Sequence, residues 1–264
     1  MIDFLIAITR EAGERILHES HRIRGKKKGS ANWVTDADLS SERFLRSAIH
    51  QAYSLHKILT DPGYEVLSEE SRETIDHPEN VSHLWVIDPL DGTTNFSYEL
   101  PFFSVSVAYV QKGIVLCGAV CDPIRRELFW AEKGKGAFLN GNRIHVKNQK
   151  NLKNALIEVG SPYLRETFDQ TYPYGQLFHK QGARIVNLSS AALECCYVAC
   201  GRLSAKFESG LKPWDIAAAK LIVEEAGGVM TSFQSHKFLI FQPNQVLAGN
   251  PEIARYIRKL IKSL

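Results

Sequence analysis

The residues best suited to chemistry lie in one nine-residue segment, 88–96, which reads Asp-Pro-Leu-Asp-Gly-Thr-Thr-Asn-Phe. The apolar segment before it, residues 84–87, is typical of a buried strand. Two carboxylates three residues apart can bind hard cations, and a glycine lets backbone N–H groups approach an anion closely. A helix beginning near Thr93 would favour a bound phosphate. The segment therefore predicts a metal and phosphate site, although each of its residues is also a common turn former.

Three other segments share this character and follow a fixed order along the chain. They read Asn-Trp-Val-Thr-Asp-Ala-Asp at 32–38, Ser-Glu-Glu-Ser at 68–71 and Leu-Lys-Pro-Trp-Asp-Ile-Ala-Ala-Ala at 211–219, with Glu-Ala-Gly-Gly at 225–228. Together with residues 88–96, these segments resemble the motifs of the inositol monophosphatase family, a group of Mg²⁺-dependent, lithium-sensitive phosphatases. The chain is similar to bacterial members of that family over about residues 30–250.

The resemblance implies a fold as well as a chemistry. It implies an α/β (α+β) layered sandwich of the sugar-phosphatase type, formed by one catalytic domain over residues 1–264. We expect an N-terminal lobe of helices and an antiparallel sheet, about residues 1–150, and a C-terminal α/β lobe, about residues 151–264. The two lobes are expected to share one active site, because the sequence contains no flexible linker or internal repeat between them.

The periodicity of the apolar residues predicts the elements themselves. Helices are expected over 2–20, 38–54, 189–200, 215–226 and 251–262. Alternating apolar residues, with turn signals at 112–113, 122–123 and 140–141, predict an antiparallel meander over 102–146. Short strands are expected at 84–87, 156–159, 205–207, 228–231, 238–241 and 246–248.

The resemblance also implies a set of metal ligands. Glu69, Asp88 and the backbone carbonyl of Leu90 would bind a first Mg²⁺, and Asp88, Asp91 and Asp215 would bind a second. Two or three ions are implied, with Mn²⁺ as an alternative, because an all-oxygen donor set favours such cations over Zn²⁺. Two ions about 3.5–4 Å apart can neutralise the phosphate, activate a water and stabilise the leaving alkoxide. The simpler alternative for Asp215 is a helix cap.

Asp38 and Thr93 are similar to the pair that activates the attacking water in this family, and Glu69 is implied to take part through its metal. The threonine hydroxyl would bind the water while the carboxylate orients the hydroxyl. Asp38 could instead cap the helix that follows it. Asp36 lies off the family position and is expected to be a turn or cap residue, and Glu70 is expected to lie behind Glu69.

Substrate contacts are implied by the same resemblance. Glu208, seven residues before Asp215, would accept hydrogen bonds from a polyol, since an ionised carboxylate is acceptor-only. Its alternative is an exposed residue at a strand end. The implied substrate-binding residues are Asp91, Gly92, Thr93, Ser161, Ser190, Ala191 and Glu208.

Four positions depart from the family pattern without touching the implied metal ligands. Val186 and Asn187 stand where bacterial members usually carry arginine, and Ser189 and Ala219 replace glycines. These departures bear on the choice of substrate and on any subunit contact in that region.

The composition restricts the class of protein to which the chain can belong. The chain has 264 residues, 44% hydrophobic and 23% charged, which is ordinary for a globular protein, and its net charge of +3 gives no independent reason to invoke nucleic acid or a membrane. Five cysteines in mostly apolar stretches indicate buried, reduced thiols and a cytoplasmic location. Neither a signal peptide nor a membrane-spanning helix is expected.

We therefore predict a cytoplasmic, Mg²⁺-dependent phosphomonoesterase that hydrolyses inositol monophosphate or a related polyol or sugar phosphate through a metal-activated water. A homodimer and inhibition by lithium are implied by the resemblance. One alternative is a bisphosphate phosphatase acting on fructose 1,6-bisphosphate or 3′-phosphoadenosine 5′-phosphate, which the basic residues 26–28 would suit.

The other alternative is a regulatory member of the family that binds nucleic acid or the transcription machinery. The basic residues of the C-terminal helix could support such contact, but a solvated helix face is the favoured interpretation. These residues are Arg255, Arg258, Lys259 and Lys262. Nucleic acid and membranes are accordingly not expected as partners.

Overall fold

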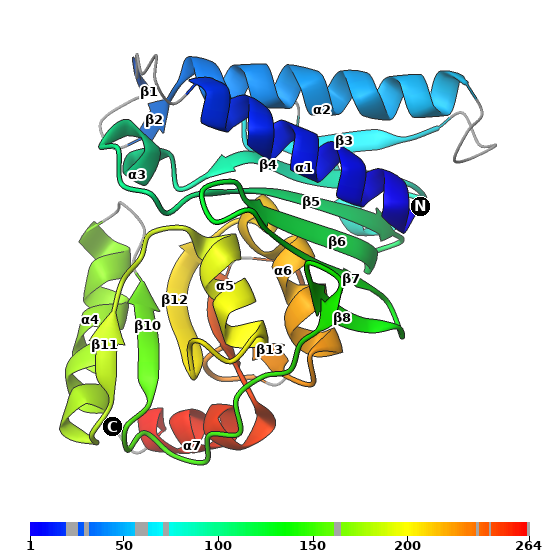
Figure 1. Cartoon of the computed structure of the whole chain (residues 1–264). Helices are drawn as coiled ribbons and strands as arrows, with labels where there is room; N and C mark the ends of the chain where they lie inside the picture. Colours follow the sequence, from blue (N-terminus) through cyan, green and yellow to red (C-terminus); the bar gives the residue numbers. More distant parts are fainter. Residues whose placement is uncertain are drawn as a thin grey trace.

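The computed structural model describes residues 1–19, 26–28, 32–55, 63–70, 74–160, 165–235, 238–242 and 244–262. Helices and sheets alternate in layers, beginning with α1 and α2 at the top of Figure 1. Helices α1 and α2 cover a seven-stranded sheet, α5 and α6 lie between this sheet and a five-stranded one, and α4 and α7 cover the outer face of the second sheet. This arrangement confirms the expected α/β layered sandwich.

The N-terminal layers comprise two long helices and the larger sheet. Helix α1 is Ile2–Glu19 and α2 is Asp36–Ser54. The sheet has the order β3-β4-β5-β6-β7-β8-β9, in which β3 is parallel to β4 and every later pair is antiparallel, as the predicted meander requires. Its strands are Glu65–Ser68, Leu84–Asp91, Ser104–Gln111, Ile114–Asp122, Glu127–Glu132, Gly136–Leu139 and Asn142–Arg143.

Three short elements complete this half. Strands β1 (Lys26–Lys28) and β2 (Asn32–Val34) form an antiparallel pair. A 3-10 helix covers Pro78–Asn80, and helix α3 covers Thr93–Ser97.

The C-terminal layers contain the smaller sheet, in the order β11-β10-β12-β14-β13. Strand β10 is parallel to both neighbours, whereas β14 is antiparallel to both of its own. The strands are Leu156–Gly160 (β10), Arg184–Val186 (β11), Ala205–Leu211 (β12), Val229–Thr231 (β13) and Asn244–Gly249 (β14). The helices are Arg165–Lys180 (α4), Ala191–Ala199 (α5), Pro213–Glu225 (α6) and Pro251–Ile261 (α7).

Three local expectations need correction. Residues 238–241 form no strand: Ile240 is buried, and Phe238 and Phe241 pack against the central core from a loop, so their apolar character reflects packing. Helix α4 was not predicted, because it is polar and contains Pro173, which usually ends a helix. Helix α2 begins at residue 36, because the Thr35 side chain caps it and its third residue completes a capping box.

The five cysteines are free, and all but Cys200 are buried, as expected for reduced thiols. Within the described ranges, no helix has both the length and the apolar character needed to cross a bilayer.

The packing of α6 on the larger sheet depends on a close approach to Gly118 of β6. An added Cβ at Gly118 would lie 2.8 Å from Cα and 2.9 Å from the carbonyl oxygen of Ala218 in α6. Because these are backbone atoms, neither can move without shifting the helix or the strand. The absence of a side chain here therefore positions α6 against the larger sheet.

We expect Gly118→Ala to lower the free energy of unfolding by about 1–3 kcal/mol, the usual cost of overpacking a core. Gly175→Ala is the matched control: it lies in α4, where the added Cβ would come no closer than 3.6 Å to Val159, and helix propensity favours alanine there. Denaturant unfolding of both variants measures the difference. Equal stability of the two would show that α6 is not held by this contact.

Candidate metal and phosphate site

The site is built at the end of β4, where the strand is irregular. Asp88 pairs with Ser106 of β5, and Asp91 pairs with Ser104, so three steps along β4 span two along β5. The extra residue forms a bulge, which bends the strand at this point. Both carboxylates then line the same cleft.

Gly92 continues the chain from β4 into α3 with a left-handed backbone, φ 94°. An added Cβ there would lie 3.1 Å from the carbonyl oxygen of Ser189 and 3.2 Å from that of Phe102. Glycine is therefore required on two grounds, its conformation and the close approach of neighbouring backbone. Helix α3 begins at Thr93, as predicted.

Four of the implied metal-binding side chains converge on one cleft of about 150 Å³. Glu69 follows β3, Asp88 and Asp91 come from β4, and Asp215 lies in the first turn of α6. The cleft is also lined by Gly92, Thr93, Ser190, Ala191 and Glu208, which were predicted, and by Thr94, Asn187, Ser189, Glu194 and Leu211, which were not. Ser161 lies outside the described residues.

The electrostatics of the cleft follow from burying several carboxyl groups side by side. Burial, together with the neighbouring carboxylates, raises the pKa of Glu69 and of Asp88 well above their ordinary values. Burial raises the pKa of Asp215 to about 8, although its hydrogen bond from the Lys212 N–H acts in the opposite direction. A hard divalent cation would relieve this repulsion, and the donors are all oxygens, so the residues present fit Mg²⁺ or Mn²⁺.

Asp91 links β4 to the N-terminus of α5. Its Oδ1 accepts a hydrogen bond from the Ala191 N–H at 2.9 Å, and its Oδ2 accepts from the Ala192 N–H at 2.9 Å. The hydroxyls of Ser190 and Ser104 donate to Oδ2 at 2.6 and 3.0 Å. Ser190 and Ala191 thus contact a predicted metal ligand directly, a link across 100 residues that no local pattern indicates.

Asp38 and Thr93 form the expected pair. The Thr93 hydroxyl lies 3.2 Å from Asp38 Oδ1 and 3.0 Å from the Leu90 carbonyl oxygen, so it can donate to either. Asp38 Oδ2 accepts from the N–H of Thr35 at 2.7 Å and from its hydroxyl at 2.5 Å. Asp38 therefore does two things at once: it completes the capping box of α2, and it holds the Thr93 side chain. Burial raises the pKa of Asp38 to about 6.

The other residues that the sequence singles out differ in how deeply they are buried. Asp36 is exposed on the first turn of α2. Glu70 is close enough for its charge to raise the pKa of both Asp38 and Glu69. Trp214 packs against the central core, as an anchor would. Glu208 is buried at 8% exposure, so its alternative as an exposed strand-end residue was wrong.

The repulsion around Asp215 gives the cation-free protein a characteristic pH dependence. Its carboxyl has a pKa of about 8 when folded and an ordinary value of 3.8, so between these limits the folded state keeps a proton that the unfolded state releases. The contribution of Asp215 to stability should therefore fall as the pH rises from about 4 to about 8 and change little above that.

We expect Asp215→Asn, treated with a chelator, to be more stable than wild type at pH 9 by at least about 1 kcal/mol, since one pKa unit corresponds to about 1.4 kcal/mol. The asparagine can still accept the Lys212 N–H. At pH 4 the advantage should vanish. Mg²⁺ should raise the melting temperature of wild type more than that of the variant, which lacks a ligand of the second implied ion. A variant less stable than wild type at pH 9 would contradict this description of the cleft.

Comparison with known proteins gives the same family. The model of the inositol monophosphatase family matches residues 1–263. The chain is 38% identical to Nus factor SuhB of Pseudomonas aeruginosa, covering 95% of this chain and 91% of that protein. Among solved structures it resembles the extragenic suppressor protein suhB of Bartonella henselae, with 32% identity, 98% and 97% of the chains covered and a TM-score of 0.86. A Thermotoga maritima IMPase gives 32% identity, 99% and 96% coverage and a TM-score of 0.84. The chain belongs to the inositol monophosphatase family.

Proposed function

We propose that this chain is a Mg²⁺-dependent phosphomonoesterase that hydrolyses inositol monophosphate or a related polyol or sugar phosphate. The observation that carries the proposal is the convergence of Glu69, Asp88, Asp91 and Asp215 in one cleft, beside the hydrogen-bonded pair of Asp38 and Thr93. Four carboxylates gathered from three separate elements are costly to bury without a function that uses them.

The residues of the cleft would bind the metal ions. Glu69, Asp88, Asp91, Asp215 and the Leu90 carbonyl would hold two or three Mg²⁺ ions, or Mn²⁺. The bound cations would supply charge neutralisation for the phosphate and acidify a water.

Thr93 can accept a hydrogen bond from that water while it donates its own proton to Asp38. Because the pKa of Asp38 is about 6, its carboxylate would be available as an acceptor above that pH. The N–H groups of Gly92 and Thr93 would bind the phosphate, with Ser161, Ser190, Ala191 and Glu208 around the rest of the substrate.

Several finer features belong to the same proposal. One domain over residues 1–264 would contain the site between its two lobes, and the protein would act as a homodimer that lithium inhibits. Five free cysteines suit a reducing compartment such as the cytoplasm. The name IMPase of the Thermotoga maritima relative supports the substrate class. A bisphosphate substrate is less favoured, because Glu208 would repel a second phosphate near it.

The test compares two aspartates of the first turn of α2. Asp38→Asn should lower the kcat for Mg²⁺-dependent phosphate release from inositol 1-phosphate by about 10²–10⁴-fold, the usual contribution of a general base. Asp36→Asn, exposed and two residues away, should keep wild-type activity. Wild-type activity should also fall below about pH 6 as Asp38 is protonated. If wild type releases no phosphate in Mg²⁺, the proposed activity is wrong; equal activity of the two variants would remove Asp38 from the mechanism.

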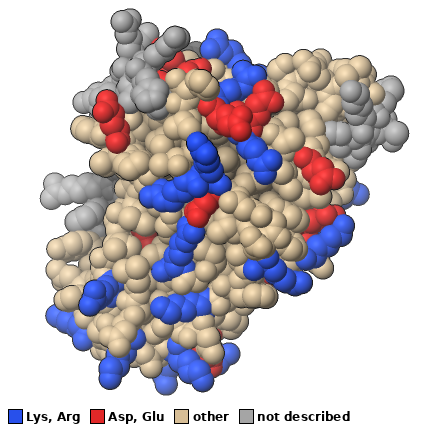
Figure 2. All heavy atoms as spheres, in the orientation of Figure 1, with Lys and Arg blue, Asp and Glu red and all other residues tan. Residues whose placement is uncertain are grey.

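A second candidate function follows from the relatives' names. Nus factor SuhB is a transcription-associated name, so the expectation that nucleic acid is not a partner finds no support. The surface offers basic residues for such contact: Lys and Arg predominate over the lower part of the face in Figure 2, which α4 and α7 occupy in Figure 1. In α7, Arg255 and Lys259 are exposed, with Lys262 just after it, whereas Arg258 is buried and donates to Thr231.

For this second function we expect binding to an RNA polymerase elongation complex that weakens with salt, as phosphate contacts do, and that Asp38→Asn retains in full. Co-sedimentation of wild type, Asp38→Asn and a variant with alanine at 255, 259 and 262 measures it. Loss of binding in the alanine variant alone would place the contact on α7. If wild type does not sediment with the complex, this candidate is rejected.

A further inference from the structure

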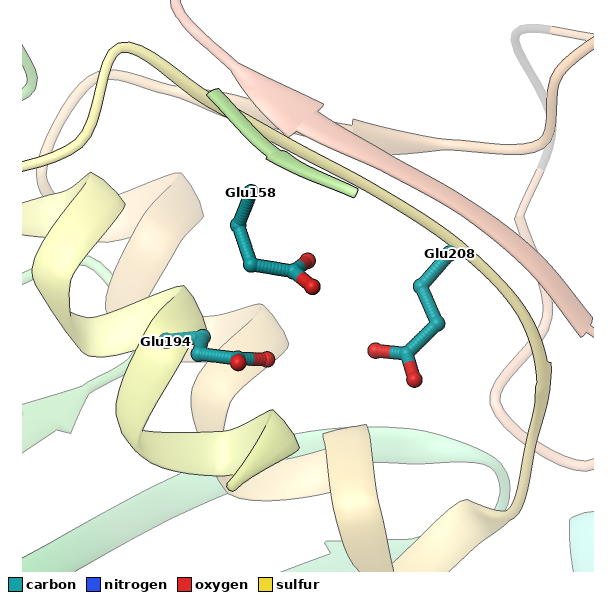
Figure 3. Close-up of side chains that lie close together, drawn as sticks. All are labelled: Glu158, Glu194 and Glu208. Carbon is teal, nitrogen blue, oxygen red and sulfur yellow. The ribbon is translucent and has the colours of Figure 1, made fainter. Parts of the chain in front are cut away.

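A second group of carboxylates lies behind the wall of the cleft. Glu158 comes from β10, Glu194 from α5 and Glu208 from β12, and Figure 3 shows their carboxyl groups directed toward one another. Each offers an oxygen within 4.8 Å of the others, and all three residues are buried. Three buried carboxylates at this spacing are a familiar donor set for a divalent cation.

The side chain of Lys206 takes the place of such a cation. Its Nζ lies 3.0 Å from Glu158 Oε2 and also donates to Glu194 Oε2 and Glu208 Oε2. An ammonium has three N–H donors, so each carboxylate receives one. Burial alone would lower the pKa of Lys206, but the carboxylates raise it well above its ordinary value, so the residue carries its charge. The cluster therefore contains its own cation and does not need a metal.

Two members of the cluster, Glu194 and Glu208, line the cleft, and Glu208 is the more exposed of the two. Its side chain is 11% exposed, whereas those of Lys206 and Glu158 are 0% exposed. Lys206 engages Oε2, which leaves the second carboxylate oxygen as an acceptor for a ligand. Glu208 also packs against Gly160, where an added Cβ would lie 2.5 Å from Glu208 Cδ and 2.7 Å from both Glu208 Oε1 and Glu158 Oε1. Lys206 and Gly160 together determine where this carboxylate lies.

The ammonium of Lys206 is also linked to residues 187–190, a segment that contributes to the lining of the cleft. Glu194, which accepts from Lys206, also accepts from the Leu188 N–H at 2.9 Å through Oε1. The Leu188 carbonyl in turn accepts from the Asn95 side chain at 2.6 Å, and Ser190, two residues on, contacts Asp91. The buried ammonium of Lys206 is thus linked to Glu208 directly, and through Glu194 to residues 188–190 beside Asp91.

We propose that Lys206 is a positioning residue for substrate specificity: it holds Glu208, and with it the wall formed by residues 187–190, where the hydroxyl groups of a polyol phosphate bind. This inference rests on the proposed phosphatase function. It predicts that Lys206 matters for the polyol part of a substrate and not for the phosphate ester, which the carboxylate cleft would handle. Phosphate esters without hydroxyl groups should therefore be insensitive to Lys206.

The experiment compares inositol 1-phosphate with phenyl phosphate, which has no hydroxyl groups on its leaving part. Lys206→Met removes the charge at similar length. It should raise the KM for inositol 1-phosphate by about tenfold or more, the loss expected from a charged hydrogen bond, with kcat nearly unchanged. kcat/KM for phenyl phosphate should stay within about twofold. Glu208→Gln should give the same selective loss, and the double variant should lose little more, since both changes affect one contact.

A second pair of variants keeps the test valid if Lys206→Met does not fold. Gly160→Ala retains all four charges and displaces Glu208, so it should show the same selective loss. Gly175→Ala, whose added Cβ makes ordinary contact with Val159, should leave both substrates unaffected.

Equal losses on both substrates, or additive losses in the double variant, would overturn the inference while the phosphatase function stands. A wild type that hydrolyses neither substrate in Mg²⁺ would overturn both.

Discussion

The cost of burying several carboxylates side by side in one cleft shapes the centre of this protein. Carboxylates from β3, β4 and α6 meet in one cleft, where burial and mutual repulsion raise the pKa of Glu69, Asp88 and Asp215. No element would place them there for stability, since each is more stable in water. The packing of the surrounding elements must therefore offset the unfavourable free energy of burying these carboxylates. Cations bound in the cleft would reduce their mutual repulsion.

The two central helices supply much of that support. Helix α6 is buried between the sheets along most of its length, and it carries Asp215 in its first turn. Helix α5 presents its first N–H groups to Asp91, a favourable arrangement because the N-terminus of a helix attracts negative charge. Asp215 thus belongs to the first turn of a buried helix, and Asp91 is hydrogen-bonded to the first turn of another. The position of α6 depends on its close approach to the larger sheet, where Gly118 leaves no room for a side chain beside Ala218.

The protein deals with buried carboxylates in two different ways a short distance apart. The residues that line the cleft include no lysine or arginine, whereas around Lys206 the chain provides a fixed cation of its own. Glu208 and Glu194 line the cleft and also bind Lys206, so the two groups share a wall. The ammonium of Lys206 thus holds two side chains of that wall from within the chain.

The sequence by itself determined the local parts of this site. The apolar residues 84–87 predicted the strand that leads into the cleft, Gly92 the turn after it, and Thr93 the start of the next helix, because these depend on neighbouring residues alone. The family motifs indicated Asp38, Glu69, Asp88, Asp91 and Asp215 together. Helix α4 was not predicted, because it contains Pro173 and proline disfavours a helix locally. Packing against the rest of the fold stabilises this helix all the same.

Other features were decided only by the tertiary structure. Nothing in the sequence around Lys206 distinguishes it from an exposed lysine in a strand, yet it is fully buried among carboxylates from β10, α5 and β12. Likewise, the hydrogen bonds from α5 to Asp91 join residues about a hundred positions apart. Periodicity and turn chemistry act over a few residues, so they predict elements and their ends. Contacts between distant segments depend on how the layers pack, and that packing determines which charges are buried together.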